Sequence, residues 1–452
     1  MDKVKKGMKT ILILGAGLSA SSLIRYLLAR AEAENWYLKI VDQNIDLVKK
    51  KINGHPNAEA ISFNALDSKE RKPAIAHADL VISMLPAIYH VDVAKDCIEV
   101  RTDLITPSYI SPEMRALNDE AKAAGIVIMN EIGVDPGIDH MSAMKVIDHI
   151  KAIGGKLTSF KSFCGGLMAP ESDNNLWHYK FTWNPRNVIL AGQGPAACYM
   201  DNNEYKYIPY NQLFKKLDRF EIPPYGFFDG YANRNSLIYA STYGIEGIPT
   251  IYRGTLRRPN YCQGWDVFIQ LGMTDDSYAM TRSETLTPRS FLNAFLPYEK
   301  HTSVEDKFKK VLGKEKADLF EQFESMGIFD DSFTYGMEQA SPAKLLQQLL
   351  EPKWKLEPGD KDMLVMYHEF EYSFGTEHKK ITSTLVTLGE DEVFTAMSNT
   401  VGLPVAIAAK LMLAGRITER GVTLPVHKEV YEPILAELET FGITFDEKEM
   451  NL

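Results

Sequence analysis

Short apolar runs and amphipathic stretches alternate along the first third of this 452-residue chain. Apolar runs bounded by turn residues are typical of buried strands, whereas apolar positions three and four residues apart are typical of helices. Regular alternation of the two patterns predicts a doubly wound parallel sheet with helices on both faces. The predicted strands are Lys9–Leu14, Tyr37–Val41, Ala60–Phe63, Asp79–Ser83, Leu104–Thr106 and Ile126–Met129.

A glycine-rich turn joins the first predicted strand to an amphipathic helix that extends to about Ala31. Gly15 allows the tight turn, Gly17 lets the backbone approach a pyrophosphate, and Ala20 takes the small position where helix and strand pack closely. The free N–H groups at the helix start favour phosphate. This context predicts a Rossmann-type nucleotide-binding domain. The turn residues expected to bind the cofactor are Gly15, Ala16, Gly17, Leu18, Ser19 and Ala20.

A carboxylate at the end of the second predicted strand predicts which cofactor binds. Asp42 stands about 20 residues past the glycines, where an acidic side chain accepts hydrogen bonds from the adenosine ribose. It would repel a 2′-phosphate, and residues 43–46 contain no Arg to reverse that preference. We therefore expect NAD to be favoured, with NADP possible.

Three further strand ends converge on the same crevice, in residues 83–86, 106–109 and 131–135. In open α/β sheets ligands bind outside the carboxyl ends of the strands. The densest of these segments, Asn130–His140, holds two glycines, a proline, three carboxylates and a histidine ahead of a helical pattern. The further residues expected to bind the cofactor are Ser83, Leu85, Pro86, Ile132, Gly133 and Val134.

The pattern changes after this segment and predicts a second, mixed α/β domain. We assign residues 1–131 and about 397–452 to the nucleotide-binding domain, residues 132–396 to the second domain, and a helical lobe to about 287–350. Helices are predicted at Met397–Leu413 and Lys428–Phe441. The strands predicted in the second domain are Thr158–Cys164, Ser236–Tyr239, Thr250–Leu256, Asp362–Phe370 and Lys380–Leu388.

Composition narrows the class of protein. Apolar residues make up 45% and charged residues 24%, as in ordinary globular proteins. A net charge of −10 without basic runs argues against a nucleic-acid partner. We find no signal peptide and no apolar stretch of the about 18 residues that span a membrane. The four scattered cysteines lack metal-ligand spacing and fit a reducing compartment, so we expect a cytoplasmic protein without a metal.

Seven segments in the family's order resemble saccharopine dehydrogenases of the glutamate-forming type, also called saccharopine reductases. They are "TPSYISPEM" (106–114), "MNEIGVDPGIDHM" (129–141), "FCGGLMAPES" (163–172), "YKFTW" (179–183), "YANRNS" (231–236), "YRGTLR" (252–257) and "NTVGLP" (399–404). The implied reaction converts L-saccharopine, NAD(P)+ and water to L-glutamate, allysine and NAD(P)H, or the reverse. One departure stands out: NADP-preferring members carry Arg and Thr after the second strand, where this chain has Asp42-Gln43-Asn44.

The resemblance also implies a substrate pocket. Saccharopine carries three carboxylates and an amine, so its site needs cations, preferably forked guanidinium groups. Lys180, Arg186 and Arg257 are further candidate cations. The residues implied to bind the substrate are Ser108, Tyr109, Asp135, Arg234, Arg253 and Thr255.

Proton transfer needs a general base in the crevice. Asp135 is our first choice because a carboxylate at a strand end can face the positive amine. Cys164 and Tyr109 are further candidates for a catalytic role, whereas His140, at a helix start, is expected to be structural. The substrate's own amine could handle much of the proton transfer.

Two rival functions stay open from sequence. One is a related reductive-condensation enzyme of the carboxy-polyamine dehydrogenase type, and the other is a nucleotide-binding regulator without turnover. A homodimer is expected from family habit alone.

Overall fold

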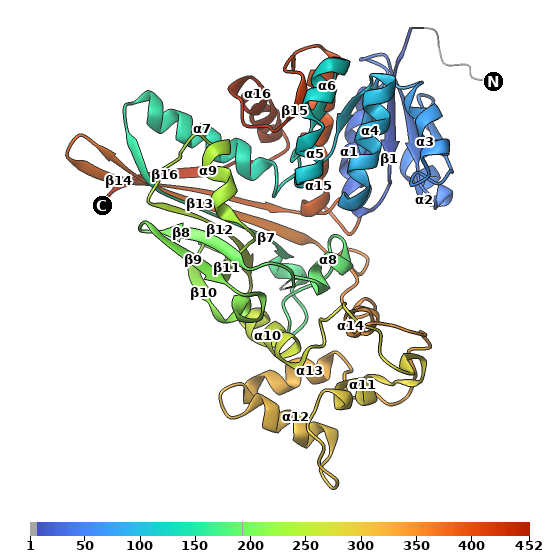
Figure 1. The fold of residues 1–452 in the computed structure, drawn as a ribbon, viewed down its shortest axis with the longest axis vertical. Helices are drawn as coiled ribbons and strands as arrows, with labels where there is room; N and C mark the ends of the chain where they lie inside the picture. The colour runs from blue at the N-terminus through green and yellow to red at the C-terminus, as the bar shows by residue number, and fades with distance from the viewer. Residues whose placement is uncertain (1–6, 192) are drawn as a thin grey trace. The chain divides into compact units, whose positions relative to one another are not determined.

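The computed structural model describes residues 7–191 and 193–452, and Figure 1 shows its fold. Its contacts divide the chain into two compact units. The first comprises the chain up to Leu157, Tyr372–Lys379 and Ser383–Leu452; the second comprises Thr158–Glu371 and Lys380–Thr382. The predicted boundaries near 131 and 397 differ from this division, because α7 (Ile138–Ala152) packs against α16 (Lys428–Glu439) within the first unit.

The first unit is built on a parallel sheet with the strand order β15-β6-β5-β4-β1-β2-β3. Most residues of β1, β4, β5 and β6 are buried, which is why these strands are recognisable as continuous apolar runs. This architecture confirms the predicted doubly wound Rossmann-type sheet. The strands are β1 Lys9–Leu14, β2 Trp36–Val41, β3 Ala58–Ile61, β4 Leu80–Ser83, β5 Asp103–Ile105, β6 Val127–Met129 and β15 Gly421–Thr423.

Helices cover both faces of this sheet. α1 and α2 contact each other, and the helices from α3 to α6 enclose an apolar cluster with the sheet. Side-chain caps begin several of them; Asn44, for example, accepts a hydrogen bond from Leu47 N at the start of α2. The helices not yet given are α1 Ser21–Arg30, α2 Ile45–Ile52, α3 Ser68–Ile75, α4 His90–Val100, α5 Pro112–Ala116, α6 Asn118–Ala124 and α15 Ala396–Leu413.

The C-terminal segment completes the first unit. α15 packs against α1 so closely that a Cβ on Gly402 would lie 2.7 Å from Leu23 N. The Ser22 N–H donates to Ser398 Oγ at 3.0 Å in the same contact. Within the described residues, α15 is the one helix long and apolar enough to cross a membrane, a feature that the sequence analysis missed. Since 78% of it is buried in the fold, it has the character of a core helix.

The second unit is built on a mixed sheet with the order β10-β11-β12-β7-β13. β12 runs parallel to β7 and antiparallel to β11. β8 pairs with β12 and with β9 at its side. The strands are β7 Lys156–Met168, β8 Ala197–Asp201, β9 Glu204–Ile208, β10 Leu217–Glu221, β11 Phe227–Ala232, β12 Thr250–Arg257 and β13 Asp362–Phe374. Two further strands, β14 Glu377–Leu388 and β16 Asp446–Asn451, lie mostly in the segments that belong to the first unit.

A helical lobe with its own aromatic core belongs to the second unit (Figure 1). Trp177 stacks on Phe268 with ring centroids 5.7 Å apart and meets Trp265 and Trp354 edge-on or tilted. The helices of this unit are α8 Pro185–Ile189, α9 Tyr239–Thr242, α10 Tyr261–Leu271, α11 Pro288–Ala294, α12 Val304–Leu312, α13 Phe320–Ser325 and α14 Pro342–Leu350.

Some predicted elements are wrong. The strand predicted at Ser236–Tyr239 is a turn of 3-10 helix followed by α9, because the Asn235 side chain accepts from Leu237 N and caps a helical start. The third strand of the first sheet is Ala58–Ile61 and lies two residues before the predicted one.

The loop between β6 and α7 is held by crowded backbone. Gly137 has φ +147°, and a Cβ there would lie 2.1 Å from Gly133 O. The Gly133 N–H donates to Pro136 O at 2.9 Å, and Ile138 N donates back to Gly133 O. Only glycine satisfies both the conformation and the close approach.

Gly137→Ala should destabilise the protein by roughly 2–6 kcal/mol, because backbone strain and the steric clash add. Urea unfolding at equilibrium measures the difference from the wild type. Gly154→Ala is the control, since its φ is +82° but its Cβ would meet open space. That variant should lose only about 1–2 kcal/mol, and equal losses in both variants would contradict the clash.

Candidate functional site

The glycine-rich turn after β1 has the geometry that a pyrophosphate requires. Gly15 has φ +99°, and a Cβ there would lie 3.0 Å from Met84 O. A Cβ on Gly17 would meet nothing within 4 Å, so this stretch of backbone faces open space. Leu18–Ala20 form one 3-10 turn that leads into α1, with Ala20 buried against the fold. The turn therefore fits a dinucleotide, with exposed backbone at the start of a helix.

The Asp42 carboxylate accepts a hydrogen bond from this turn. Its Oδ2 accepts from Ala16 N at 2.8 Å and its Oδ1 accepts from Asn44 N at 2.9 Å. The carboxylate is only partly buried. It lies at the end of β2, where ribose hydroxyls bind in Rossmann-type domains.

Lys51, which the sequence analysis missed, also contacts the turn. Its Nζ donates to Gly17 O at 2.7 Å and to Ser21 Oγ at 2.8 Å. Burial lowers the pKa of Lys51 to about 8, and the nearby Asp42 charge opposes that shift. A cation thus lies beside the predicted phosphate site.

A buried histidine joins the next two strand ends. His90, on the first turn of α4, is 3% exposed. Its Nδ1 is 3.0 Å from Ser83 Oγ, and its Nε2 is 2.8 Å from Ser108 Oγ and 2.9 Å from Thr106 Oγ1. Burial lowers the pKa of His90 to about 4, so the ring is neutral near pH 7. The sequence analysis also missed this residue, which lies seven positions after the end of β4, at the start of α4.

Two of the predicted substrate residues meet beside this network. The Tyr109 hydroxyl donates to Asp135 Oδ1 at 2.6 Å. Tyr109 follows β5 and Asp135 follows β6, two adjacent strands. The structure therefore brings Ser108, Tyr109 and Asp135 to neighbouring ends of one sheet.

Glu131 and His140 are structural residues of the same loop. Glu131 Oε2 is 2.7 Å from His140 Nε2, and both side chains are at most 1% exposed. The other carboxylate oxygen accepts from Ile110 N at 2.9 Å. The pair ties the loop after β5 to the start of α7, as the sequence predicted for His140.

The other residues predicted to bind the cofactor differ in exposure. Ile132 and Val134 are buried, so they could meet a ligand mainly through their backbone. Leu85 is half-buried and packs on the apolar cluster, whereas Pro86 is exposed. The hydroxyl of Ser83 is engaged with His90.

In the second unit, candidate residues form a row across the sheet. Cys164 on β7 is in register with Thr255 on β12, and Thr255 is in register with Tyr231 on β11. Residues in register point to the same face. Tyr231 was not among the predicted residues. Thr255 is partly buried and Cys164 is 7% exposed.

The predicted arginines lie in different environments. Arg234 is exposed, has φ +53°, and its carbonyl accepts from Cys198 N at 2.9 Å. Arg253 is 5% exposed, with its guanidinium 4.2 Å from the Tyr239 ring centroid. Of the two, Arg234 is the more accessible to a ligand.

The further candidate cations are engaged elsewhere in the second unit. Lys180 forms a buried ion pair with Asp360 at 2.6 Å, and Arg186 pairs with Asp276. Arg257 is 5% exposed and lies against the rings of Tyr179, Tyr231 and Tyr261. Lys180 and Arg186 are thus engaged in ion pairs, and Arg257 is engaged with aromatic rings.

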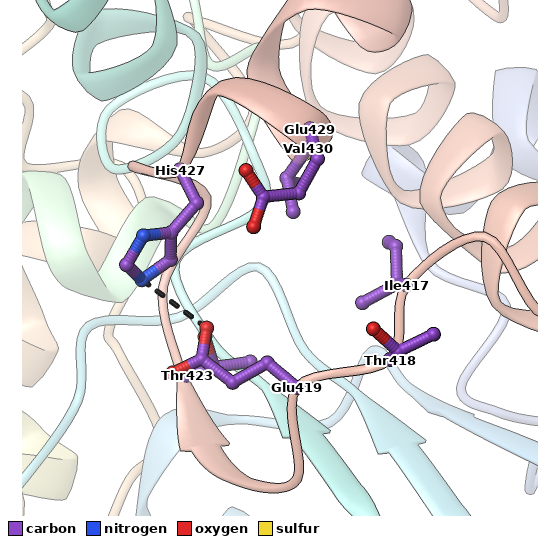
Figure 2. A pocket seen from close by; sticks show the side chains of 7 residues that line it. All are labelled: Ile417, Thr418, Glu419, Thr423, His427, Glu429 and Val430. Carbon is purple, nitrogen blue, oxygen red and sulfur yellow. Dashed lines mark ion pairs between the residues drawn. The ribbon is translucent and has the colours of Figure 1, made fainter.

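A hollow of about 360 Å³ lies at the edge strand β15 and the start of α16 (Figure 2). His427 and Glu419 form an exposed ion pair of 3.2 Å at its side. Exposed pairs of this kind contribute little energy. None of the residues predicted for the site lines this hollow, and within residues 7–191 and 193–452 no cluster of His, Cys, Asp and Glu could hold a metal ion.

Comparison with known proteins identifies relatives over nearly the whole chain. Residues 11–129 match the family profile described as the saccharopine dehydrogenase NADP binding domain, and residues 133–443 match the saccharopine dehydrogenase C-terminal domain. Saccharopine dehydrogenase [NADP(+), L-glutamate-forming] of Saccharomyces cerevisiae is 34% identical over 97% of this chain and 99% of its own length.

A longer relative and a solved structure show the same similarity to saccharopine dehydrogenases. Mitochondrial alpha-aminoadipic semialdehyde synthase of Bos taurus is 34% identical over 97% of this chain, which spans only 47% of that protein. The structure of apo saccharopine dehydrogenase (L-Glu forming) from Saccharomyces cerevisiae matches with a TM-score of 0.87 and 33% identity. The match covers 98% of this chain and all of the other.

The buried histidine predicts a pH dependence of stability. In the unfolded chain His90 has the ordinary histidine pKa of 6.5 and binds a proton below that pH. In the folded protein burial lowers its pKa to about 4, so the ring stays neutral down to that pH. The stability that this neutral ring contributes is full above about pH 6.5 and is lost as the pH falls towards 4. His90 alone should lower the free energy of unfolding by about 2 kcal/mol between pH 7 and pH 5.

Urea unfolding of the wild type and of His90→Asn at both pH values measures this. The variant should lose that part of the pH dependence, whereas His77→Asn, at an exposed position of the same unit, should retain it. An unchanged pH dependence in His90→Asn would show that the buried ring is not its source.

Proposed function

The chain belongs to the saccharopine dehydrogenase family, and on that basis we propose that it interconverts L-saccharopine with L-glutamate and allysine. In the oxidative direction, saccharopine, NAD(P)+ and water give glutamate, allysine, NAD(P)H and a proton. The full-length match to the yeast saccharopine dehydrogenase carries this proposal. The protein is accordingly an oxidoreductase that acts on a CH–NH donor and uses a nicotinamide cofactor.

The first unit supplies the features that a nicotinamide dinucleotide needs. The cofactor itself would accept the hydride. The open backbone at Gly17 fits the pyrophosphate, and Asp42 fits the adenosine ribose. The strand-end hydroxyls held by His90 belong to the same edge of the sheet.

We assign the proton-transfer role to Asp135. A carboxylate is the right group to accept a proton from the substrate amine or from the water that attacks the imine. The hydrogen bond from Tyr109 fixes the orientation of the carboxylate. Tyr109 and Cys164 stay secondary candidates, and we expect Ser108, Arg234, Arg253 and Thr255 to bind the substrate.

Production of NADH or NADPH after saccharopine is added tests the function. A related reductive-condensation enzyme would turn over another substrate, and a regulatory protein would bind the nucleotide without turnover. The cytoplasmic location and a homodimer stay predictions.

The preference between the two cofactors is a separate proposal. Asp42 would repel a 2′-phosphate, which supports NAD, whereas the matched family profile and the yeast relative bear the name NADP. We retain NAD as the favoured cofactor on the strength of the carboxylate. Asp42→Asn keeps an oxygen acceptor for the Ala16 N–H and removes the charge, so it should relax the discrimination against NADP.

Steady-state kinetics with NAD and NADP measure the discrimination. Asp42→Ala should also relax it, and Asp46→Ala, at an exposed position in the following helix, is the charge-matched control. A tenfold or greater preference of the wild type for NADP, equivalent to about 1.4 kcal/mol, would contradict the assignment of NAD.

Arg234→Ala should weaken the use of saccharopine and leave cofactor binding nearly intact, because we expect the guanidinium to pair with a substrate carboxylate. Loss of one partner of a desolvated charge pair costs about 2–5 kcal/mol, or roughly 30- to several-thousand-fold in kcat/KM. Arg234→Lys should rescue poorly, since an ammonium cannot form two parallel hydrogen bonds.

Saccharopine kinetics and NADH titration on these variants separate the two effects. Arg282→Ala is a matched control, because Arg282 is also exposed, lies in the same unit and has a positive φ of +56°. If Arg234→Ala keeps kcat/KM within about twofold of the wild type, Arg234 does not bind the substrate.

A further inference from the structure

Lys51 brings a positive charge to the glycine-rich turn from a neighbouring helix. It stands near the end of α2, which follows β2. Its ammonium bridges α2 to the start of α1 through Gly17 O and Ser21 Oγ. An ammonium has three N–H donors, so these two acceptors leave the third for a ligand oxygen.

The charge of Lys51 lacks a carboxylate at contact distance. Both of its hydrogen bonds go to neutral oxygens, and the described residues include no ion-pair partner for it. Its helix neighbour Lys49, by contrast, is exposed and lies 3.6 Å from Asp46. Removing an ammonium from water without a counter-ion is unfavourable, and burial accordingly lowers the pKa of Lys51 to about 8. An anionic ligand would offset this cost.

The position of Asp42 indicates which anion it would be. The carboxylate marks the ribose end of the dinucleotide site and is close enough to Lys51 to raise its pKa against the effect of burial. A group on the ribose 2′ position would therefore meet both charges. A 2′-phosphate carries about −1.5 to −2 charges near pH 7, so Asp42 repels it and Lys51 attracts it.

We propose that Lys51 binds the 2′-phosphate of NADP and offsets the repulsion by Asp42. This inference rests on the proposed use of a nicotinamide dinucleotide. Residues directly after β2 contain no Arg for this task, and Lys51 reaches the turn from the next helix instead. The site thereby accepts both cofactors, with the two charges acting in opposite directions on NADP.

A structural role for Lys51 makes a different prediction. If its hydrogen bonds only tied α2 to α1, removal of its charge would affect NAD and NADP alike. The same holds if the ammonium binds the pyrophosphate, because both cofactors carry that group. Only a contact to the 2′-phosphate separates the two cofactors.

Dissociation constants of NADH and NADPH, measured by fluorescence titration without saccharopine, test the inference. Lys51→Gln keeps a hydrogen-bond donor and removes the charge. It should weaken NADPH about tenfold or more, as expected for one charge-assisted hydrogen bond, and weaken NADH less than twofold. Lys51→Arg should retain NADPH binding within about threefold, and Lys50→Gln, at an exposed position of the same helix, should change neither constant.

Adenosine 2′,5′-bisphosphate and adenosine 5′-monophosphate provide a second readout on the same proteins. Lys51→Gln should weaken the bisphosphate about tenfold and leave the monophosphate within twofold. If Lys51→Gln does not fold, Lys51→Met serves in the same comparison. Equal losses for both cofactors, or no loss for NADPH, would overturn the role of Lys51. A wild type that binds neither NADH nor NADPH would instead overturn the proposed function.

Discussion

The hydrogen bond from Ala16 N–H to the Asp42 carboxylate joins the ends of β1 and β2, and the nucleotide turn depends on it. A second bond, from Gly15 N to Val41 O at 2.8 Å, holds the same junction through the backbone. Together they fix where the turn leaves the sheet and in which direction α1 starts. The open backbone at Gly17, the reach of Lys51 and the packing of α15 on α1 all follow from that direction.

The sequence was sufficient to predict the first sheet, since parallel strands buried on both faces are continuous apolar runs. It was poorer for β9 and β10, in which three of the five residues are exposed, and for β8, in which three of the five are only partly buried. It failed at Ser236–Tyr239, where one capping side chain outweighed an apolar run. Such side-chain hydrogen bonds compete locally with strand formation.

In the candidate site, too, residues that follow a local sequence pattern were predictable, whereas residues that depend on long-range contacts were not. The position of the glycines and Asp42 at one turn was predictable from their spacing along the chain. Lys51 and His90 were missed because each forms hydrogen bonds to residues outside its own helix. No pattern in the local sequence indicates such contacts. Arg253 and Arg257 stand on one strand with similar burial, and only the fold reveals that Arg257 lies among three tyrosine rings.

The contact between Ser22 and Ser398 joins residues that are 376 positions apart. A ribosome therefore releases α1 and the glycine-rich turn long before α15 exists to cover them. During that interval the surface of α1 that α15 covers has no helix against it, and β6 lacks its neighbour β15. The nucleotide-binding unit therefore cannot be completed until the second unit, whose residues end at Thr382, has been synthesised.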